Sequence, residues 1–215
     1  MKKFETNNYL SGIAKIAEGF IDSPEYEKVI EILLDCHWRG GTIFTMGCGG
    51  SASTATHFAA DLAKTVGGFK AISLVDNTPL VSAWTNDFGW ESVFVGQLTH
   101  WITSNDVLVG FSVHGGNNQW SGNLTMAMKF AKEKGAKVIG FAGFDGGAMK
   151  KRADACLVVP TNSEVYGTPL VEAMHVVLHH GIIFDLKERI KLIKNLEYFT
   201  IRQTWKILKS GMTQE

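Results

Sequence analysis

With 215 residues, 45% of them hydrophobic and 20% charged, the chain is large enough for one domain with a substantial buried core. Its 21 basic residues balance its 21 acidic ones, so the overall charge gives no support for binding to nucleic acid or to a membrane. The three cysteines lack the spacing of a disulfide framework, and neither a secretory leader nor an apolar run of roughly 20 residues is evident, which predicts a cytoplasmic protein.

The chain begins with a predicted helical pair at about residues 8–39, divided into residues 8–20 and 24–39. Ser23 followed by Pro24 is typical of an N-cap with proline at the first helical position. The same pattern recurs at Thr78-Pro79 and Thr168-Pro169, so we expect helices to begin there as well.

The first predicted strand, residues 42–46, leads directly into a glycine-rich turn and a helix over residues 51–65. Gly49, Gly50 and Ser51 stand where backbone N–H groups and the helix dipole can hold a phosphate. His57 and Asp61, four residues apart, share one face of that helix and could form an acid–base or metal-binding pair. The alternative is a close-packed glycine turn with a surface histidine.

Strand-like and helix-like segments then alternate, which predicts a doubly wound α/β fold around a five-stranded parallel sheet. The other four strands are expected at residues 71–75, 107–112, 137–142 and 155–159. The intervening helices are expected at residues 79–103 (interrupted near residue 89), 121–134 and 146–152. Ligands of such folds bind at the carboxyl ends of the strands.

Two polar segments follow predicted strands and are therefore candidates for ligand contacts. The loop over residues 110–123 contains Ser112 and Ser121 together with amide side chains and glycines, whose O–H and N–H groups suit an oxyanion without adding net charge. Asp87, after the second strand, could bind a polyhydroxylated ligand. Either segment could equally be an ordinary solvated loop or turn.

The last part of the sheet core, which we place at about residues 42–187, is a long apolar helix predicted over residues 169–187. Glu172 lies in its first turn, and His180 follows eight residues later, roughly 80° round the helix. His179 points about 100° away from His180, and all three histidines of this helix could be surface residues. A C-terminal helical extension at about residues 188–209 is amphipathic, which favours burial against a partner subunit.

Two histidines and two carboxylates would make a plausible divalent-metal site if the helix of His57 and Asp61 met the helix of Glu172 and His180. The same groups could serve as a general acid and base. Spacing along the sequence does not establish that the two helices meet.

The run Gly47-Cys48-Gly49-Gly50-Ser51-Ala52, followed by His57-Phe58-Ala59-Ala60-Asp61, resembles the first ligand loop of the sugar isomerase (SIS) domain family. Further similar segments lie at residues 85–94, 106–112, 131–140, 145–147 and 172–175, and the resemblance extends from about residue 25 to 187. The phosphoheptose isomerases are the most similar subgroup. They interconvert sedoheptulose 7-phosphate and a mannoheptose 7-phosphate.

The resemblance implies a flavodoxin-like SIS fold, residues 1–215 forming one SIS domain with extra terminal helices, and a homotetramer with active sites between subunits. It implies that Ser51, Ser112 and Ser121 hold the substrate phosphate, and that Asp61 and His180 transfer protons through an enediol. The remaining expected substrate contacts are Gly49, Gly50, Asp87, Thr168 and Glu172. A zinc or other divalent ion, one per active site, would be held by His57, Asp61, Glu172 and His180.

The chain departs from the family pattern at several of these positions. Cys48 replaces an asparagine, Asp61 replaces a glutamate, and Glu172 replaces a glutamine. The second loop is also longer than usual and contains His114 and two glycines. We therefore expect a metal-assisted aldose–ketose isomerase of a phosphorylated heptose or a similar sugar, and retain a non-catalytic SIS protein that binds a sugar phosphate or a protein partner as the alternative.

Overall fold

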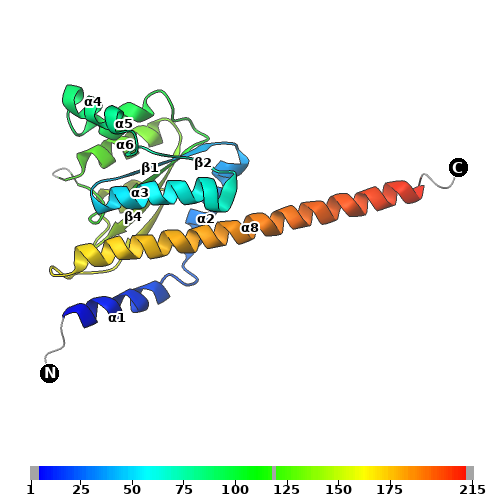
Figure 1. Ribbon diagram of the computed structural model, residues 1–215, viewed down its shortest axis with the longest axis horizontal. Coiled ribbons are helices and arrows are strands. Elements are labelled where there is room, and N and C mark those ends of the chain that lie inside the picture. The colour runs from blue at the N-terminus through cyan, green and yellow to red at the C-terminus, as the bar shows by residue number, and fades with distance from the viewer. Residues whose placement is uncertain (1–4, 118–119, 212–215) are drawn as a thin grey trace.

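A computed structural model gives the fold of residues 5–117 and 120–211, and only the backbone course of the last helix beyond residue 196 (Figure 1). Five strands form one parallel sheet in the order β2-β1-β3-β4-β5. They are β1 (Thr42–Gly47), β2 (Lys70–Ser73), β3 (Val107–Phe111), β4 (Lys137–Gly143) and β5 (Ala155–Val159). This order confirms the predicted flavodoxin-like, doubly wound sheet.

Helices cover both faces of the sheet because every central strand is apolar on both sides. One face buries α2 (Pro24–Trp38), α3 (Gly50–Ala60) and α8 (Gly167–Gly211). The other face buries α5 (Ser92–Leu98), α6 (Gly122–Glu133) and α7 (Gly147–Arg152), and α4 (Thr78–Phe88) packs against α5. No helix in the described part of the chain is long and apolar enough to cross a membrane.

The last helix, α8, is a single element of 45 residues that spans both the predicted apolar helix and the predicted C-terminal extension. Its first half packs against α1 (Glu5–Glu18), α2 and α3, whereas its distal half projects away from the domain (Figure 1). Arg189 ties α8 to α2 through a two-pronged pairing with Glu27. The amphipathic pattern predicted for residues 188–209 rests partly on Phe199, Ile207 and Leu208, whose side chains lie outside the described part.

One of the three predicted proline caps is confirmed and two are wrong. Ser23 caps α2 and accepts a hydrogen bond from the Tyr26 N–H. At α4 the cap is Asn77, whose side chain accepts from the Leu80 N–H, so Thr78 lies inside the first turn. Thr168 likewise lies inside α8, which begins at Gly167.

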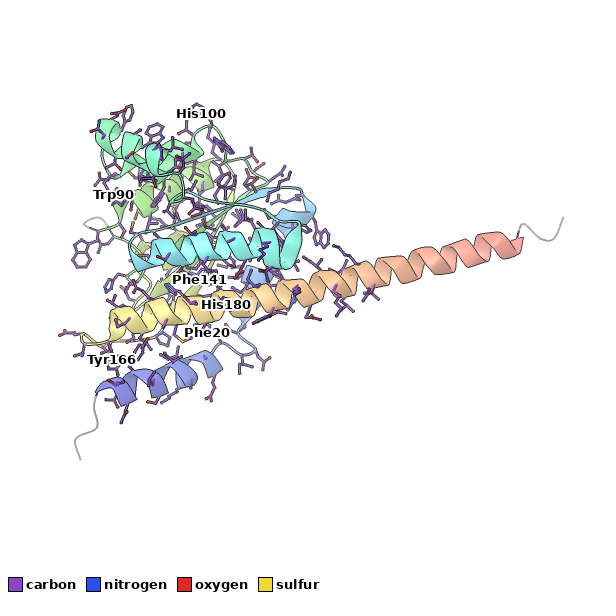
Figure 2. All side chains as sticks on the ribbon, viewed as in Figure 1. Phe20, Trp90, His100, Phe141, Tyr166 and His180 are labelled. Carbon is purple, nitrogen blue, oxygen red and sulfur yellow. The ribbon has the colours of Figure 1, made fainter. Side chains whose placement is uncertain are left out.

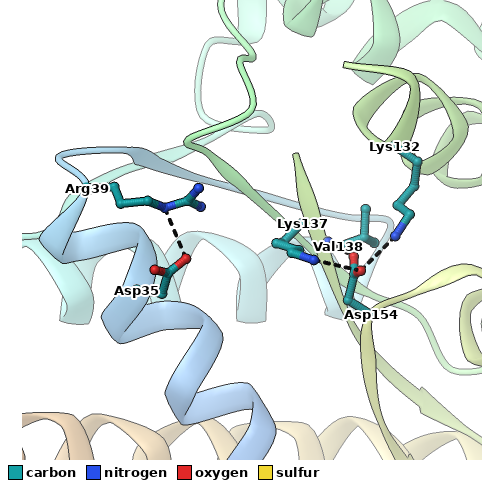
Figure 3. A network of polar contacts seen from close by, with 6 residues as sticks. All are labelled: Asp35, Arg39, Lys132, Lys137, Val138 and Asp154. Atoms are coloured by element: carbon teal, nitrogen blue, oxygen red, sulfur yellow. Dashed lines mark hydrogen bonds and ion pairs between the residues drawn. The ribbon is translucent and has the colours of Figure 1, made fainter. Parts of the chain in front are cut away.

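Carboxylates accept hydrogen bonds from backbone N–H groups at the amino ends of the strands, at the edge of the sheet opposite to the glycine-rich turn. Asp106 accepts hydrogen bonds from the backbone N–H groups of Thr42, at 2.7 Å, and Thr103, at 2.6 Å. Asp154 accepts from Lys132 at 2.7 Å and from the Val138 N–H at 2.8 Å (Figure 3). Burial alone would raise the pKa of Asp154, but these bonds outweigh it and hold that pKa below its ordinary value.

Candidate active site

The glycine turn between β1 and α3 is required by close packing. A Cβ atom at Gly47 would lie 2.4 Å from the carbonyl oxygen of Ser51, and Gly49 has a φ of 60°. The turn therefore brings the N-terminus of α3, with the buried Ser51, to the carboxyl edge of the sheet. This is the predicted geometry of an anion cradle.

The three serines expected to hold a phosphate line one small cavity of about 160 Å³. Ser51 comes from α3, Ser112 from the end of β3, and Ser121 from the residue before α6. Cys48, on the same wall, accepts a hydrogen bond from the Asn123 amide at 3.3 Å. The structure thus brings together hydroxyl groups from the first turn of α3 and from both ends of the loop between β3 and α6, in a space suited to a small anion.

The two extra glycines of the second loop have a structural role. The carbonyl groups of Gly115 and Gly116 accept hydrogen bonds from the N–H groups of Met149 and Ala148, both at 2.8 Å, and so satisfy the first turn of α7. The loop passes so close to that turn that a Cβ at Gly115 would lie 2.0 Å from the Gly146 carbonyl oxygen. Residues 118 and 119 of this loop lie outside the described part.

His57 and Asp61 lie at the junction of α3 with a short π-helix, η1 (Asp61–Gly67). The sequence predicted one uninterrupted α-helix here. His57 Nε2 lies 3.4 Å from Asp61 Oδ2, while Asp61 Oδ1 accepts a hydrogen bond from Thr65 at 2.9 Å. A π-turn is rare and is often found at functional sites.

Two histidines of the neighbouring helix α8 also lie close to the Asp61 carboxylate. His180, labelled in Figure 2, lies with its Nε2 3.7 Å from Asp61 Oδ2. The Nε2 atom of His179 lies 3.6 Å from the same oxygen. The rings of His179 and His180 are 4.2 Å apart, and His57 packs edge-on to both, at 4.7 and 5.0 Å. The two helices therefore meet, as the sequence predicted. The contact also includes His179, which was expected to point about 100° away from His180.

Glu172 is not part of this cluster. Its carboxylate lies beside Gly50, where a Cβ atom would come within 2.5 Å of Glu172 Oε1. Together with His57 it lines a separate cavity of about 390 Å³ at the first turn of α8. The one group of ligand atoms within 4.8 Å of one another that we find among the described residues belongs to His57, Asp61, His179 and His180.

His179 is the most perturbed member of the cluster. Burial lowers its pKa to about 4, and the neighbouring His180 and His57 act in the same direction, against the opposing effect of Asp61. Both of its ring nitrogens are buried with no hydrogen-bond partner within the described part of the chain. A neutral imidazole with an available lone pair, beside two further imidazoles and a carboxylate, fits a divalent transition metal.

Two predicted substrate contacts lie apart from these cavities. Asp87 is exposed near the end of α4, where the Asn86 amide donates to it at 2.8 Å. Thr168 is exposed in the first turn of α8. Neither is among the described residues that line the serine cavity or the cavity beside Glu172.

Comparison with known proteins gives a consistent set of relatives. Residues 8–143 match the SIS domain family. The chain is 45% identical over 159 residues to lincomycin biosynthesis protein LmbN of Streptomyces lincolnensis. The matched region covers 71% of this chain but only 58% of LmbN. It is 36% identical over 179 residues to the phosphoheptose isomerase of Citrifermentans bemidjiense, covering 80% of this chain and 87% of the relative.

A solved structure has a similar fold over most of the chain. The phosphoheptose isomerase GmhA from Neisseria gonorrhoeae superposes with a TM-score of 0.76 at 28% sequence identity. The superposition covers 86% of this chain and 95% of that one.

Proposed function

Since the chain belongs to the SIS domain family, we propose that it is an aldose–ketose isomerase that acts on a phosphorylated sugar. The observation that carries the proposal is the presence of two sites along α3. A serine-lined cavity at its N-terminus, by the carboxyl edge of the sheet, suits a phosphate, and a cluster of imidazoles around Asp61, at its other end, suits proton transfer. The relatives named phosphoheptose isomerase make sedoheptulose 7-phosphate and a mannoheptose 7-phosphate the substrate pair we propose.

In the proposed reaction Asp61 is the base. It removes the proton from the carbon next to the substrate carbonyl, and the electron pair of that C–H bond forms the enediol double bond. His180 donates a proton to the carbonyl oxygen as this happens, from the ring nitrogen that does not face the metal site. Return of a proton to the neighbouring carbon, with loss of the other hydroxyl proton, completes the conversion between ketose and aldose. The proximity of His180 Nε2 to Asp61 Oδ2, 3.7 Å, supports this division of roles.

The donor set also supports a bound zinc or other divalent ion, one per site, in contact with His57, Asp61 and His180. Such an ion would supply Lewis-acid stabilisation of negative charge on the substrate oxygens. We propose that Ser51, Ser112 and Ser121 orient the substrate through its phosphate and that Glu172, beside Gly50, faces its sugar part.

We further propose a homotetramer. Large apolar side chains are exposed along one side of α8, among them Val177, Phe184 and Leu192, with exposed fractions of 43%, 67% and 59%. Surface of this kind commonly lies in an interface between subunits. Association through α8 would also place a neighbouring subunit next to the half-exposed His57.

The test is proton exchange in deuterated water. We expect the chain to incorporate deuterium at the carbon next to the carbonyl of sedoheptulose 7-phosphate, and Asp61→Asn to lose this activity by about 100-fold or more, the usual scale of general base catalysis. Asp35→Asn, a matched change at an exposed position of α2 outside both cavities and the cluster, should exchange at the normal rate. Undiminished exchange in Asp61→Asn would show that another group is the base. Binding of the sugar phosphate without exchange or turnover would favour the non-catalytic alternative.

A further inference from the structure

We infer that His179 is a ligand of the divalent metal, so that the ion is held by three imidazoles and one carboxylate, from His57, Asp61, His179 and His180. Glu172 then stays outside the coordination shell. This inference rests on the proposed function, because it concerns the metal of the same site, and it replaces one member of the ligand set that the sequence predicted.

The first argument is the unmet hydrogen-bonding demand of His179. Its side chain is fully buried, and both ring nitrogens lack a partner within the described part of the chain. Its Nε2 lies 3.6 Å from Asp61 Oδ2, which is too far for a hydrogen bond. Buried polar atoms are almost always satisfied, so the orphaned nitrogens point to a missing partner.

His175, one turn earlier on α8, shows what a structural histidine looks like in this core. It is also fully buried and its Nδ1 likewise has no partner among the described residues, but its Nε2 lies 3.2 Å from the Ala142 carbonyl oxygen and can donate to it. Its ring packs against Phe111 and Phe141. His179 has no comparable tie to the sheet, and instead faces the other imidazoles of the cluster.

The second argument is the spacing of the donor atoms. The Nε2 atoms of His57, His179 and His180 lie 3.4, 3.6 and 3.7 Å from Asp61 Oδ2. Donors bound to one tetrahedral zinc ion at about 2.0–2.2 Å lie about 3.3–3.6 Å apart. The three imidazoles are thus already near the required separation from Asp61 Oδ2, and all four donor atoms lie within 4.8 Å of one another.

The third argument is the charge of the assembled site. Three neutral imidazoles and one carboxylate leave a divalent ion with a net charge of about +1. Exchanging His179 for Glu172 as a ligand would cancel that charge. A net positive centre stabilises a developing oxyanion and attracts an anionic sugar, whereas a neutral one does so less. The position of Glu172 beside Gly50, away from the cluster, agrees with the positive site.

The experiment measures binding of zinc alone, with no sugar present, to the full-length chain after the removal of bound metal. His179→Leu should weaken zinc affinity at least 10-fold and change the visible spectrum of the cobalt-substituted protein. Glu172→Gln, the matched control, should keep zinc affinity within about threefold and leave that spectrum unchanged. Thermal melting of the metal-free variants checks that both are folded.

Unchanged affinity in His179→Leu would overturn the inference, as would a large loss confined to Glu172→Gln or the absence of zinc binding to the unsubstituted chain. If His179→Leu does not fold, the unsubstituted chain with ¹⁵N-labelled histidine decides the question. Zinc should then shift the ring-nitrogen signals of three of the seven histidines, and a shift of only two would contradict the proposal. Because neither readout uses a sugar, failure here is distinct from failure of the isomerase proposal, which isotope exchange tests.

Discussion

At the scale of single residues, His175 and His179 show that a buried imidazole on the same helix can have a structural role or belong to a candidate site. His175 is held by the Ala142 carbonyl group and by two phenylalanine rings, so its neutral form is part of the core. His179 lies one turn further along, and its neighbours are the groups of the proposed metal site. Burial lowers the pKa of each ring to about 4.

The pKa of His175 predicts a dependence of folding stability on pH. The unfolded chain takes up this proton near pH 6.5 and the folded chain only near 4, so the stabilisation is complete above pH 6.5 and is lost as the pH falls towards 4. Between pH 7 and pH 5 this one group should remove about 2 kcal/mol from the free energy of unfolding. Urea unfolding at both pH values should show a smaller loss in His175→Phe than in the unsubstituted chain. Equal losses in both proteins would contradict the assignment.

At the scale of elements, the two edges of the sheet are used differently. Structural carboxylates bind backbone N–H groups at the amino ends of β1 and β4, and the serines of the proposed phosphate site lie at the carboxyl ends. Asp154 is the clearest case, because one side chain joins α6, β4 and the start of β5 (Figure 3).

Asp154→Asn should therefore lower the free energy of unfolding by about 1–3 kcal/mol, since it weakens charge-assisted bonds to a carboxylate that is only 15% exposed. Asp35→Asn is the matched control. Asp35 is also paired, with Arg39 at 3.0 Å, but it is 59% exposed, so its loss should cost less than about 0.5 kcal/mol. Chemical denaturation of the three proteins at neutral pH checks the difference. Similar costs for the two substitutions would show that the Asp154 network contributes little.

The sequence predicted the sheet well because strands buried on both faces appear as short continuous apolar runs between turn residues. The anion cradle was also predictable, since glycines and Ser51 directly follow the first of these runs. The four-residue spacing of His57 and Asp61 likewise placed both on one helix face.

The sequence did not predict the π-helix at Asp61 or the role of His179. A π-turn has no distinctive composition, so residues 51–65 appeared as one regular helix. His179 and His180 point about 100° apart, which argued against both meeting the same partner. The structure has Asp61 at the contact between η1 and α8, where Nε2 atoms on adjacent residues reach the same oxygen. The adjacent histidine pair was the one available signal.

At the scale of the whole molecule, the exposed apolar side of α8 bears on assembly. If the chain forms the proposed homotetramer, light scattering should give about four times the chain mass of 23.6 kDa. Phe184→Glu, which puts a charge at a 67% exposed apolar position, should lower that mass. Lys129→Glu on α6, an exposed site that is already charged, should not. A mass of one chain for the unsubstituted protein would contradict the proposal.

The continuity of α8 links the two ends of the molecule mechanically. About 31 residues of the same helix follow His180, so the tip of the rod stands roughly 45 Å from the imidazole cluster. The histidine pair and the projecting segment are thus parts of one continuous helix, so the direction in which the segment projects is fixed by the packing of the same helix against α3 and η1.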